Sequence, residues 1–485
     1  MKHVSKALIL ILLLATSFNY HSYAQDDSWS LKRSVRYALE HNITIQQNEL
    51  NKRLAKLTLT QSRLSQLPNV NANTNYGRSF GRSVDPTTNQ FVDNTSYDFM
   101  SIGGSADVLV FGWFQRRNRI SQNKYNLRAA EVDLEQIMND VSLNVATGYL
   151  RLLLAKEQIK INEQQAALSK AQLEQTTQFV EAGRLPELNV AQLEAQLASD
   201  SANLISALTE YNAAVLDIKA ILNLDFETPF EPEVPTFDIE KEIETILVDP
   251  ETVYLAAEKN LGTVRSNELR LIAAKKGYWA AKGALLPVVA LNAQAGTNYS
   301  TTFKDYNLTG GYTESRIFGS YAYDSTSKNR YDIYQLQPQY TTSTIPLGKQ
   351  LDNNFRQTVS IGVNIPLFNG WQSQTALKQA KINMMSQQLN LRQSELKLRQ
   401  DVYKAHNDAK NAVQKYYAAK RSADAAKRAY DFAQKRNELG LTNTIEYLVT
   451  QNNYAKASGN LASAKYDLVF KLKVIDYYLG NEIKL

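Results

Sequence analysis

The feature that most constrains this fold is an internal duplication of the chain. The segment SVRYALEHN at 34–42 recurs as TVYLAAEKN at 252–260, an offset of 218 residues. The segment LPNV at 67–70 recurs as LPVV at 286–289, an offset of 219. Because a repeat of this length determines the whole architecture, it has to be identified before any shorter pattern. We expect one structural unit that is built twice.

Two further pairs of residues extend the duplication. Phe111 recurs as Phe368 and Gly183 recurs as Gly440, each at an offset of 257, so 72 residues separate the Phe from the Gly in both copies. The offset changes only before the Phe, where the second copy carries a longer insertion. The predicted segments are a signal peptide at 1–24, a first repeat at 25–222, a linker at 223–249, a second repeat at 250–470 and a C-terminal tail at 471–485.

Each copy begins with a helical pattern of about 36 residues, at 31–67 and 250–286. Pro68 and Pro287 end these helices and start the strands, since proline lacks the amide hydrogen that a helix interior requires.

Long polar helical patterns follow the strands, at 112–182 and 371–439. Gly183 and Gly440 end them, and a further helix of about 36 residues returns in each copy. Two helices of this length equal one of about 70 residues, which at 1.5 Å per residue is roughly 105 Å long. Two short helices beside one long helix, twice in the chain, indicate a tall cylinder and not a compact globule.

Apolar residues recur every seven positions along these helices. The series are Val190, Leu197, Leu204, Tyr211, Ile218; Leu208, Val215, Leu222; Leu127, Leu134, Val141; and Ile382, Leu389, Leu396, Tyr403. This spacing is typical of a coiled-coil seam, and an amphipathic bundle in a soluble protein is the alternative. Because the other faces consist of Gln, Asn, Lys and Glu, we interpret the helices as the wall of a water-filled tube.

Four segments alternate apolar and polar residues with a period of two. Their apolar sets are Val70, Ala72, Thr74, Tyr76; Ile102, Ala106, Val108, Val110; Val289, Leu291, Ala293, Ala295; and Val359, Ile361, Val363, Ile365, Leu367. A sheet between lipid and water has this alternation, and so does a half-buried sheet of a soluble protein. The opposite faces carry Asn, Ser, Gly and Gln, which favours a pore lining.

Four strands are too few to close a barrel across a bilayer, and lipid does not tolerate unpaired strand edges. Several copies therefore have to share one barrel, and three copies supply twelve strands, enough for a channel. Where strands leave lipid and helices enter water, the sequence has aromatic residues, as in a membrane girdle. These residues are Phe111, Trp113, Phe368 and Trp371. We expect Gly112 and Gly370 to allow the change of backbone direction.

Two connections between strands face away from the helices, at 81–98 and 304–353. The second contains Tyr306, Tyr312, Tyr321, Tyr323, Tyr331, Tyr334 and Tyr340. A loop of this length is unusual in a compact domain and often functional. We interpret it as a self-packed cap over the barrel mouth, and contact with a partner or a glycan is the alternative.

The N-terminus matches an export signal. Lys2 and Lys6 are basic, 7–15 is apolar and Ser-Tyr-Ala at 22–24 is a cleavage site. An N-terminal anchor is the alternative, although a membrane helix needs about 20 apolar residues.

Composition excludes several classes of function. The chain has no cysteine, which excludes disulfides, thiolate metal sites and a lipid anchor on cysteine. Without Lys2 and Lys6 the formal net charge falls from +6 to +4, which gives no case for nucleic-acid binding. Of four histidines only His41 and His406 lie beyond the signal, and no P-loop, dinucleotide fingerprint, HExxH or Gly-x-Ser-x-Gly element is present. We therefore expect no catalytic residue, no cofactor and no metal site.

The order, duplication and spacing of these motifs resemble the TolC family of outer membrane efflux proteins, over essentially the whole mature chain. The residues that carry the resemblance are SLKRSVRYALEHN at 30–42, Pro68, Pro287, VFGW at 110–113, LFNGW at 367–371, Gly183 and Gly440. The resemblance implies a mixed α/β membrane protein: a homotrimer with a shared transmembrane β-barrel, four strands per protomer, and a long periplasmic α-helical coiled-coil tunnel. It would lie in the outer membrane of a Gram-negative bacterium, with an equatorial girdle from the linker and tail.

The resemblance also implies a function. The protein would be a passive exit duct of a tripartite efflux or type I secretion system, energised by an inner-membrane transporter through a periplasmic adaptor protein. The helical turns would close the tunnel at rest and contact the adaptor. In the family's best-studied gate, acids lie six and nine positions after the second turn glycine, where this chain has Glu446 and Val449; the first copy has Asn189 and Gln192.

We hypothesise that Glu446 from three chains forms a weak polar constriction. An exposed acid that the dipole stabilises near a helix N-terminus is the alternative. Two other protein classes are alternatives. A secreted coiled-coil structural or adhesive protein would not need the four alternating strands, and a periplasmic adaptor has one helical hairpin where this chain has two.

Overall fold

The computed structural model describes residues 28–84, 89, 91–93, 96–235, 243, 248–439 and 441–481. The predicted signal peptide and Gly440 lie outside these residues, as do parts of the predicted linker and tail. The chain divides into two compact units, and each draws on both sequence repeats. The first unit consists of Met1–Leu57, Lys124–Ala273 and Met385–Leu485, and the second of Thr58–Asn123 and Ala274–Met384.

Four long helices confirm the duplication. They are α4 (Gln115–Glu181) and α10 (Gln372–Glu438), with 67 residues each, and α5 (Glu187–Leu222) and α11 (Thr444–Leu479), with 36 each. At 1.5 Å per residue, α4 and α10 are each roughly 100 Å long. Asn223 and Gly480, at equivalent positions, end the returning helices in the left-handed conformation, so the copies share their caps as well as their lengths.

The predicted helices at 31–67 and 250–286 are each divided in two, which corrects the sequence interpretation. The observed helices are α2 (Leu31–His41), α3 (Ile43–Leu64), α7 (Pro250–Asn260) and α8 (Gly262–Gly283). One extended residue interrupts each pair, Asn42 at ψ 125° and Leu261 at ψ 142°. The side chain of Asn42 stabilises its break, because Oδ1 accepts the N–H of Thr44 at 2.9 Å. Periodicity did not reveal the interruptions since neither residue is Gly or Pro.

The core of the first unit surrounds Tyr149, which is fully buried on α4. Its hydroxyl lies 2.6 Å from the carbonyl oxygen of Trp29 and 2.7 Å from that of Glu233. Burial raises the pKa of Tyr149 well above the ordinary tyrosine value, so the hydroxyl stays a donor. These contacts hold a short parallel pair, β1 (Ser28–Trp29) and β6 (Glu231–Pro232), against the helices.

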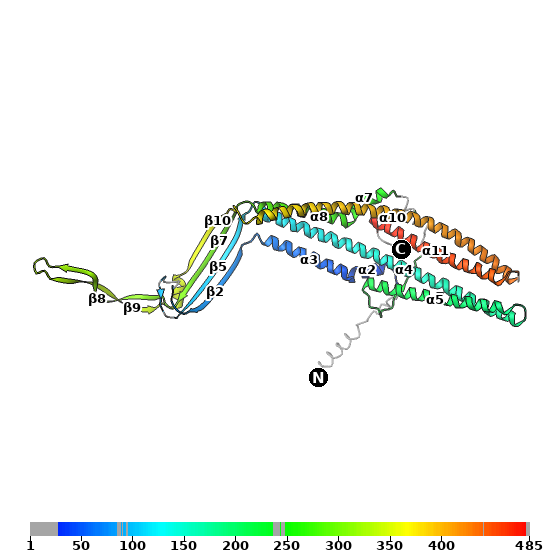
Figure 1. The fold of residues 1–485 in the computed structure, drawn as a ribbon, viewed down its shortest axis with the longest axis horizontal. Coiled ribbons are helices and arrows are strands. Elements are labelled where there is room, and N and C mark those ends of the chain that lie inside the picture. The colour runs from blue at the N-terminus through cyan, green and yellow to red at the C-terminus, as the bar shows by residue number, and fades with distance from the viewer. Residues whose placement is uncertain are drawn as a thin grey trace, which may run out of the picture. The chain divides into compact units, whose positions relative to one another are not determined.

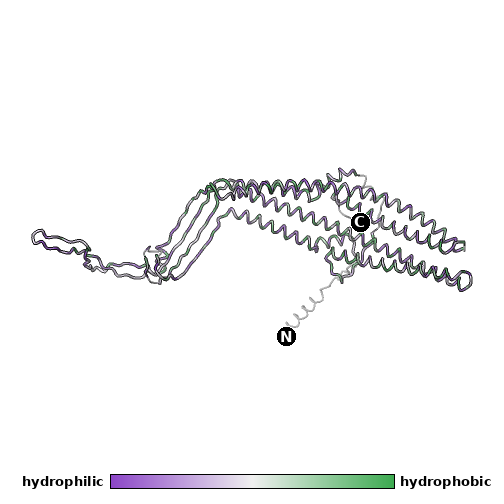
Figure 2. The backbone as a smooth tube through the Cα atoms, in the orientation of Figure 1, coloured by the Kyte–Doolittle hydropathy of each residue, from purple (hydrophilic) through white to green (hydrophobic). Residues whose placement is uncertain are grey.

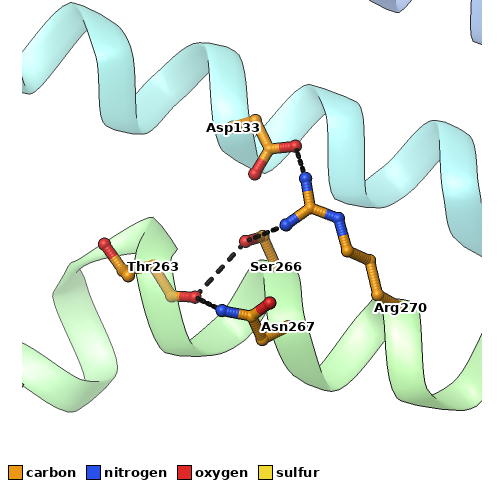
Figure 3. Close-up of polar contacts among 5 residues, drawn as sticks. All are labelled: Asp133, Thr263, Ser266, Asn267 and Arg270. Atoms are coloured by element: carbon orange, nitrogen blue, oxygen red, sulfur yellow. Dashed lines mark hydrogen bonds and ion pairs between the residues drawn. The ribbon is translucent and has the colours of Figure 1, made fainter. Parts of the chain in front are cut away.

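Helix α8 approaches α4 closely through a glycine and a polar cluster (Figure 3). Arg270 forms an ion pair with Asp133 of α4, and its second terminal nitrogen donates to Ser266 Oγ at 3.4 Å. At Gly262 a Cβ atom would lie 2.8 Å from the carbonyl oxygen of Val132. Only glycine therefore allows this contact without a shift of the backbone.

The second unit contains a four-stranded antiparallel sheet in the order β10-β7-β5-β2 (Figure 1). The strands are β2 (Asn69–Ser79), β5 (Tyr97–Phe111), β7 (Val288–Ser300) and β10 (Arg356–Asn364). All four predicted strands are present, and Pro68 and Pro287 directly precede β2 and β7. Strands β2 and β10 are the edges, and no strand of the described chain pairs with the outer side of either.

Cross-strand register places the predicted apolar sets on one face of this sheet. Val70 lies opposite Ala106, which lies opposite Ala293, which lies opposite Val359. At the two edges of the sheet, Val70 is 72% exposed and Val359 is 73% exposed. The alternation read from the sequence therefore holds across all four strands, up to Leu109 in β5.

A β-bulge corrects one position of that pattern. The register of β5 against β7 shifts between Leu109 and Phe111, so Phe111 and not Val110 lies opposite Val289. Val110 had been assigned to the apolar face by simple alternation. An extra residue in one strand moves every later side chain to the other face.

Residues 304–353 form regular structure, which corrects the prediction of a loop. Strands β8 (Lys304–Tyr323) and β9 (Arg330–Thr344) pair as a long antiparallel ribbon, and α9 (Leu347–Asn353) follows. The connection at 81–98 contains a smaller ribbon of β3 (Ser83–Val84) and β4 (Phe91–Val92). Tyr and Thr are enriched in strands, so the tyrosine content was a strand signal that the sequence interpretation did not use.

Figure 2 shows hydrophilic and hydrophobic residues interleaved along the helices. No helix in the described part of the chain is apolar over a stretch that would cross a bilayer.

We expect Gly262→Ala to lower the free energy of unfolding by about 1–3 kcal/mol, because the added methyl group forces α8 away from α4. The matched control is Gly459→Ala inside α11, where the nearest atom to a Cβ is a flexible side-chain oxygen of Gln158 at 3.5 Å. That substitution should be neutral or should stabilise by about 0.5–1 kcal/mol, as alanine favours the helix. Thermal unfolding followed by circular dichroism compares the two, and equal effects would contradict the close approach.

Candidate functional site

The two predicted tip turns share one hydrogen-bond geometry. After α4, the N–H of Arg184 donates to the carbonyl oxygen of Phe179 at 2.8 Å. After α10, the N–H of Leu441 donates to that of Arg436, also at 2.8 Å and at positions offset by 257. Gly183 has φ +67°, the left-handed conformation that glycine favours at the end of a helix. The duplication therefore extends to the backbone of the turns.

The residues predicted near the gate lie at the beginning of α5 and α11. Glu446 and Val449 are exposed on α11, and Glu446 Oε1 lies 3.5 Å from Nη1 of Arg436. Asn189 and Gln192 are half-buried on α5. No hydrogen bond or ion pair in the described residues joins the pair on α5 to the pair on α11, although the two helices meet nearby, where Gln196 Nε2 donates to Asn452 Oδ1 at 3.0 Å.

A tyrosine next to Glu446 joins the two helical hairpins, α4–α5 and α10–α11. The hydroxyl of Tyr447 accepts the side-chain N–H of Gln172 on α4 at 2.6 Å and lies 3.3 Å from the hydroxyl of Tyr430 on α10. Burial, and then the Tyr430 hydroxyl, raise the pKa of Tyr447 far above its ordinary value, so it remains protonated. Sequence analysis did not single out this contact, because it depends on residues 275 positions apart.

A buried carboxylate lies between the same hairpins. Asp200 on α5 is only 4% exposed, and it accepts hydrogen bonds from Ser169 Oγ at 2.6 Å and Gln196 Nε2 at 2.9 Å. Gln451 of α11 donates to Ser169 at 3.3 Å and extends the network to the second hairpin. Because a carboxylate is costly to bury without donors, these residues hold one another in place. A signal was present in the sequence: Asp200 follows the buried Leu193 by seven residues, and a polar residue at a seam position specifies helix register.

The sheet has a polar face opposite its apolar one. Asn73, Gly103, Gly296 and Arg356 lie across the four strands in one row. They line a hollow of about 530 Å³ together with further Ser, Thr, Gln and Asn side chains. The glycines leave space at the centre of the row, so this face suits water.

The apolar face has the height of a membrane band. At the end next to the helices Phe111 lies opposite Val289, and at the other end Tyr76, Met100 and Tyr299 form a row. Eleven residues of β7 connect these ends. At about 3.3 Å per residue and a strand tilt of about 35–45°, the ten steps between these ends cover roughly 23–27 Å, close to the hydrophobic band of about 25 Å in membrane barrels.

The predicted girdle residues lie where strands join helices. The rings of Phe111 and Trp113 are 5.3 Å apart. Lys378 Nζ lies 4.7 Å from the ring centroid of Trp371, and Phe368 is 79% exposed. An ammonium group beside an exposed aromatic ring is typical of the headgroup level of a membrane.

The backbone at these junctions differs in part from the expectation. Gly370 is left-handed at φ +60°, as predicted, and Trp371 after it has φ +67°. In the first copy Gly112 is not left-handed, and Trp113 and Phe114 are, at φ +47° and +61°. The change of direction there therefore occurs after the glycine. A bulky residue with positive φ is strained, so packing of the aromatic side chains has to hold it.

The histidines have structural contacts. The ring of His41 stacks on Tyr37 with centroids 4.1 Å apart, and His406 Nε2 lies 3.1 Å from the carbonyl oxygen of Val248. Within the described ranges, no three or more His, Cys, Asp and Glu side chains are grouped so as to hold a metal ion.

Comparison with known proteins matches both halves of the chain to one family model. The model describes outer membrane efflux proteins and matches residues 35–224 and 253–481. No curated protein sequence matches the chain.

Several solved structures have the same fold. The outer membrane protein VceC of Vibrio cholerae has a TM-score of 0.72 at 14% identity, with 94% of this chain and 97% of that chain covered. The CmeC outer membrane channel of Campylobacter jejuni has a TM-score of 0.72 at 16% identity, with coverage of 93% and 85%. The MtrE outer membrane channel of Neisseria gonorrhoeae, in its open state, has a TM-score of 0.69 at 16% identity, with coverage of 93% and 89%.

At these identities the solved structures establish the fold, a helical tunnel with a barrel, and confirm the predicted fold class. The family match adds the place and the class of function, because it covers both repeats. Proteins of this family are passive channels in the outer membrane of Gram-negative bacteria, with their helices in the periplasm. This chain belongs to the outer membrane efflux protein family and is therefore a channel protein, not an enzyme.

Proposed function

We propose that three copies of this chain form one exit duct, which an inner-membrane transporter energises through a periplasmic adaptor protein. The observation that carries the proposal is that the two edge strands of the sheet, β2 and β10, have no partner strand on their outer side in the described residues.

The strand edges require a partner in lipid. The outer backbone groups of β2 and β10 have no strand of the described chain beside them. An unpaired backbone group in hydrocarbon costs several kcal/mol, so the two edges have to meet other strands. Pairing β2 of one copy with β10 of the next closes the ring without any free edge, and twelve strands leave room for a channel.

Helices α3 and α10 each carry a series of exposed apolar residues, and the two series have the same spacing. On α3 the exposed series is Leu50, Leu57 and Leu64, and on α10 it is Ile382, Leu389, Leu396 and Tyr403. Both repeat every seven residues, the spacing of a coiled-coil seam. Since α3 precedes β2 and α10 follows β10 in the chain, we infer that neighbouring copies cover these two series as well.

Cysteine cross-linking tests the assembly directly, because the chain has no cysteine of its own. Asn71→Cys on β2 is combined in turn with Thr358→Cys, Ser360→Cys or Gly362→Cys on β10. Within one chain β2 and β10 are separated by two strands, about 14 Å, too far for a disulfide. We expect one of these registers to give a covalent product of three chains on a denaturing gel.

The control is Asn71→Cys with Gln294→Cys on β7, a central strand on the same polar face, which should remain monomeric. If every register on β10 also leaves monomers, the shared barrel is refuted.

We also propose that the tip turns form the periplasmic gate and the adaptor contact. The Glu446–Arg436 pair lies at the beginning of α11, where three copies would meet around the channel axis. The constriction would then consist of three ion pairs and not of three bare acids. The side chains nearest the axis could also include Val449, Asn189 and Gln192.

Replacing Glu446 should change ion flow through the closed channel. Glu446→Gln leaves Arg436 unopposed, so the cation preference of single-channel conductance in a planar bilayer should fall. Glu438→Gln is the control, since it removes the same charge from the same hairpin at a carboxylate bonded to Gln434. Equal shifts in both variants, or no shift in either, would show that Glu446 is not at the constriction.

A further inference from the structure

The β8–β9 ribbon has two chemically distinct faces. Its register pairs Leu308 with Tyr340 and Tyr312 with Pro338, and β9 is regular between these pairs. One face, here called the tyrosine face, therefore contains Tyr306, Leu308, Tyr312, Tyr334, Leu336, Pro338 and Tyr340, together with the polar residues Glu314, Arg316 and Thr342. The opposite face, here called the amide face, contains Asn307, Thr313, Ser315, Gln335, Gln337 and Thr341.

The tyrosine face is open to solvent in the single chain. Its side chains include Leu308 and Tyr312, each 65% exposed, and Leu336, 60% exposed. A two-stranded ribbon alone is at best marginally stable in water, and a long apolar face marks an interface. The tyrosine face is exposed along most of the ribbon, so we expect another protein surface to pack against it.

We propose that the tyrosine faces of ribbons from neighbouring copies pack against one another at the outer mouth of the channel. The inference rests on the proposed three-copy assembly, which brings three ribbons to one rim. Each ribbon is tethered between β7 and β10, two strands of the barrel sheet, with only short connections (Figure 1). Tethering of this kind gives effective concentrations on the order of mM, so modest contacts are enough for association.

The charge of the ribbon favours contact with a second copy of the chain over contact with an anionic partner. Residues 304–344 contain four cations and four acids, a net charge of zero. The charged residues of the tyrosine face, Glu314 and Arg316, have opposite signs, and Arg316 also pairs with Asp332 at 2.7 Å. Identical ribbons therefore do not repel each other. A phosphate-rich lipid surface would be bound by an excess of Lys and Arg, which the ribbon lacks.

Two neighbouring positions test the inference. Leu336→Cys lies on the tyrosine face and Gln337→Cys on the amide face, and both side chains are exposed in the single chain. Each full-length variant in outer membranes is treated with a short bis-maleimide of about 10 Å reach, the distance between packed sheets. We expect several-fold more cross-linked dimer from Leu336→Cys than from Gln337→Cys.

Each outcome is decisive when the Asn71–β10 disulfide is measured in parallel. Equal cross-linking at positions 336 and 337, or none at 336 while the Asn71 disulfide forms, refutes the ribbon contact and leaves the channel standing. Failure of both refutes the assembly and the inference with it. A maleimide-polyethylene glycol reagent adds a second measurement: Leu336→Cys should react several-fold more slowly than Gln337→Cys. Protection of position 336 without cross-linking would show that something other than a second copy covers the face.

Discussion

The unpaired backbone groups along β2 and β10 are the constraint on which the rest of the structure depends. In water these groups would be solvated at little cost, but next to an exposed apolar face of membrane height they have no such option. In the proposed assembly, strands from neighbouring copies complete these edges. The apolar face crosses all four strands of the sheet, from the Val289–Phe111 pair at one end to the row of Tyr76, Met100 and Tyr299 at the other.

Inside the helical unit, polar groups find their partners within the same chain. The hairpins α4–α5 and α10–α11 are joined by hydroxyl and amide groups around Tyr447 and Asp200, and these side chains are buried. Apolar seams alone permit helices to slide past each other, whereas a buried polar group is satisfied in one register only. The buried polar contacts around Tyr447 and Asp200 thus fix the helix register, whereas the Arg436–Glu446 pair is exposed near the turn.

The duplication was predicted correctly because motifs, segment lengths and turn positions all recur between the two copies. The 257-residue offset links the turn hydrogen bonds and the caps at Asn223 and Gly480. The strands were predictable for the same reason: a period of two over many residues is a strong local signal. The tip residues were located in this way too, but the contacts of Tyr447 with Gln172 and of Gln451 with Ser169 were not, since both join helices from different repeats.

The sequence by itself determined the repeated unit, the long helices, the four strands and the two chemically different faces of the sheet. These features follow from short-range periodicity, which every copy of the pattern reinforces. Only the tertiary structure decided the breaks at Asn42 and Leu261, the bulge that turns Phe111 to the apolar face, and the ribbon at 304–344. The breaks are held by hydrogen bonds between residues distant in sequence, from Asn42 Nδ2 to the carbonyl oxygen of Ile221 and from the N–H of Gly262 to Gln136 Oε1, and the bulge depends on strand pairing. Such partners leave no mark on the local pattern, whereas the ribbon left a signal in its tyrosine content.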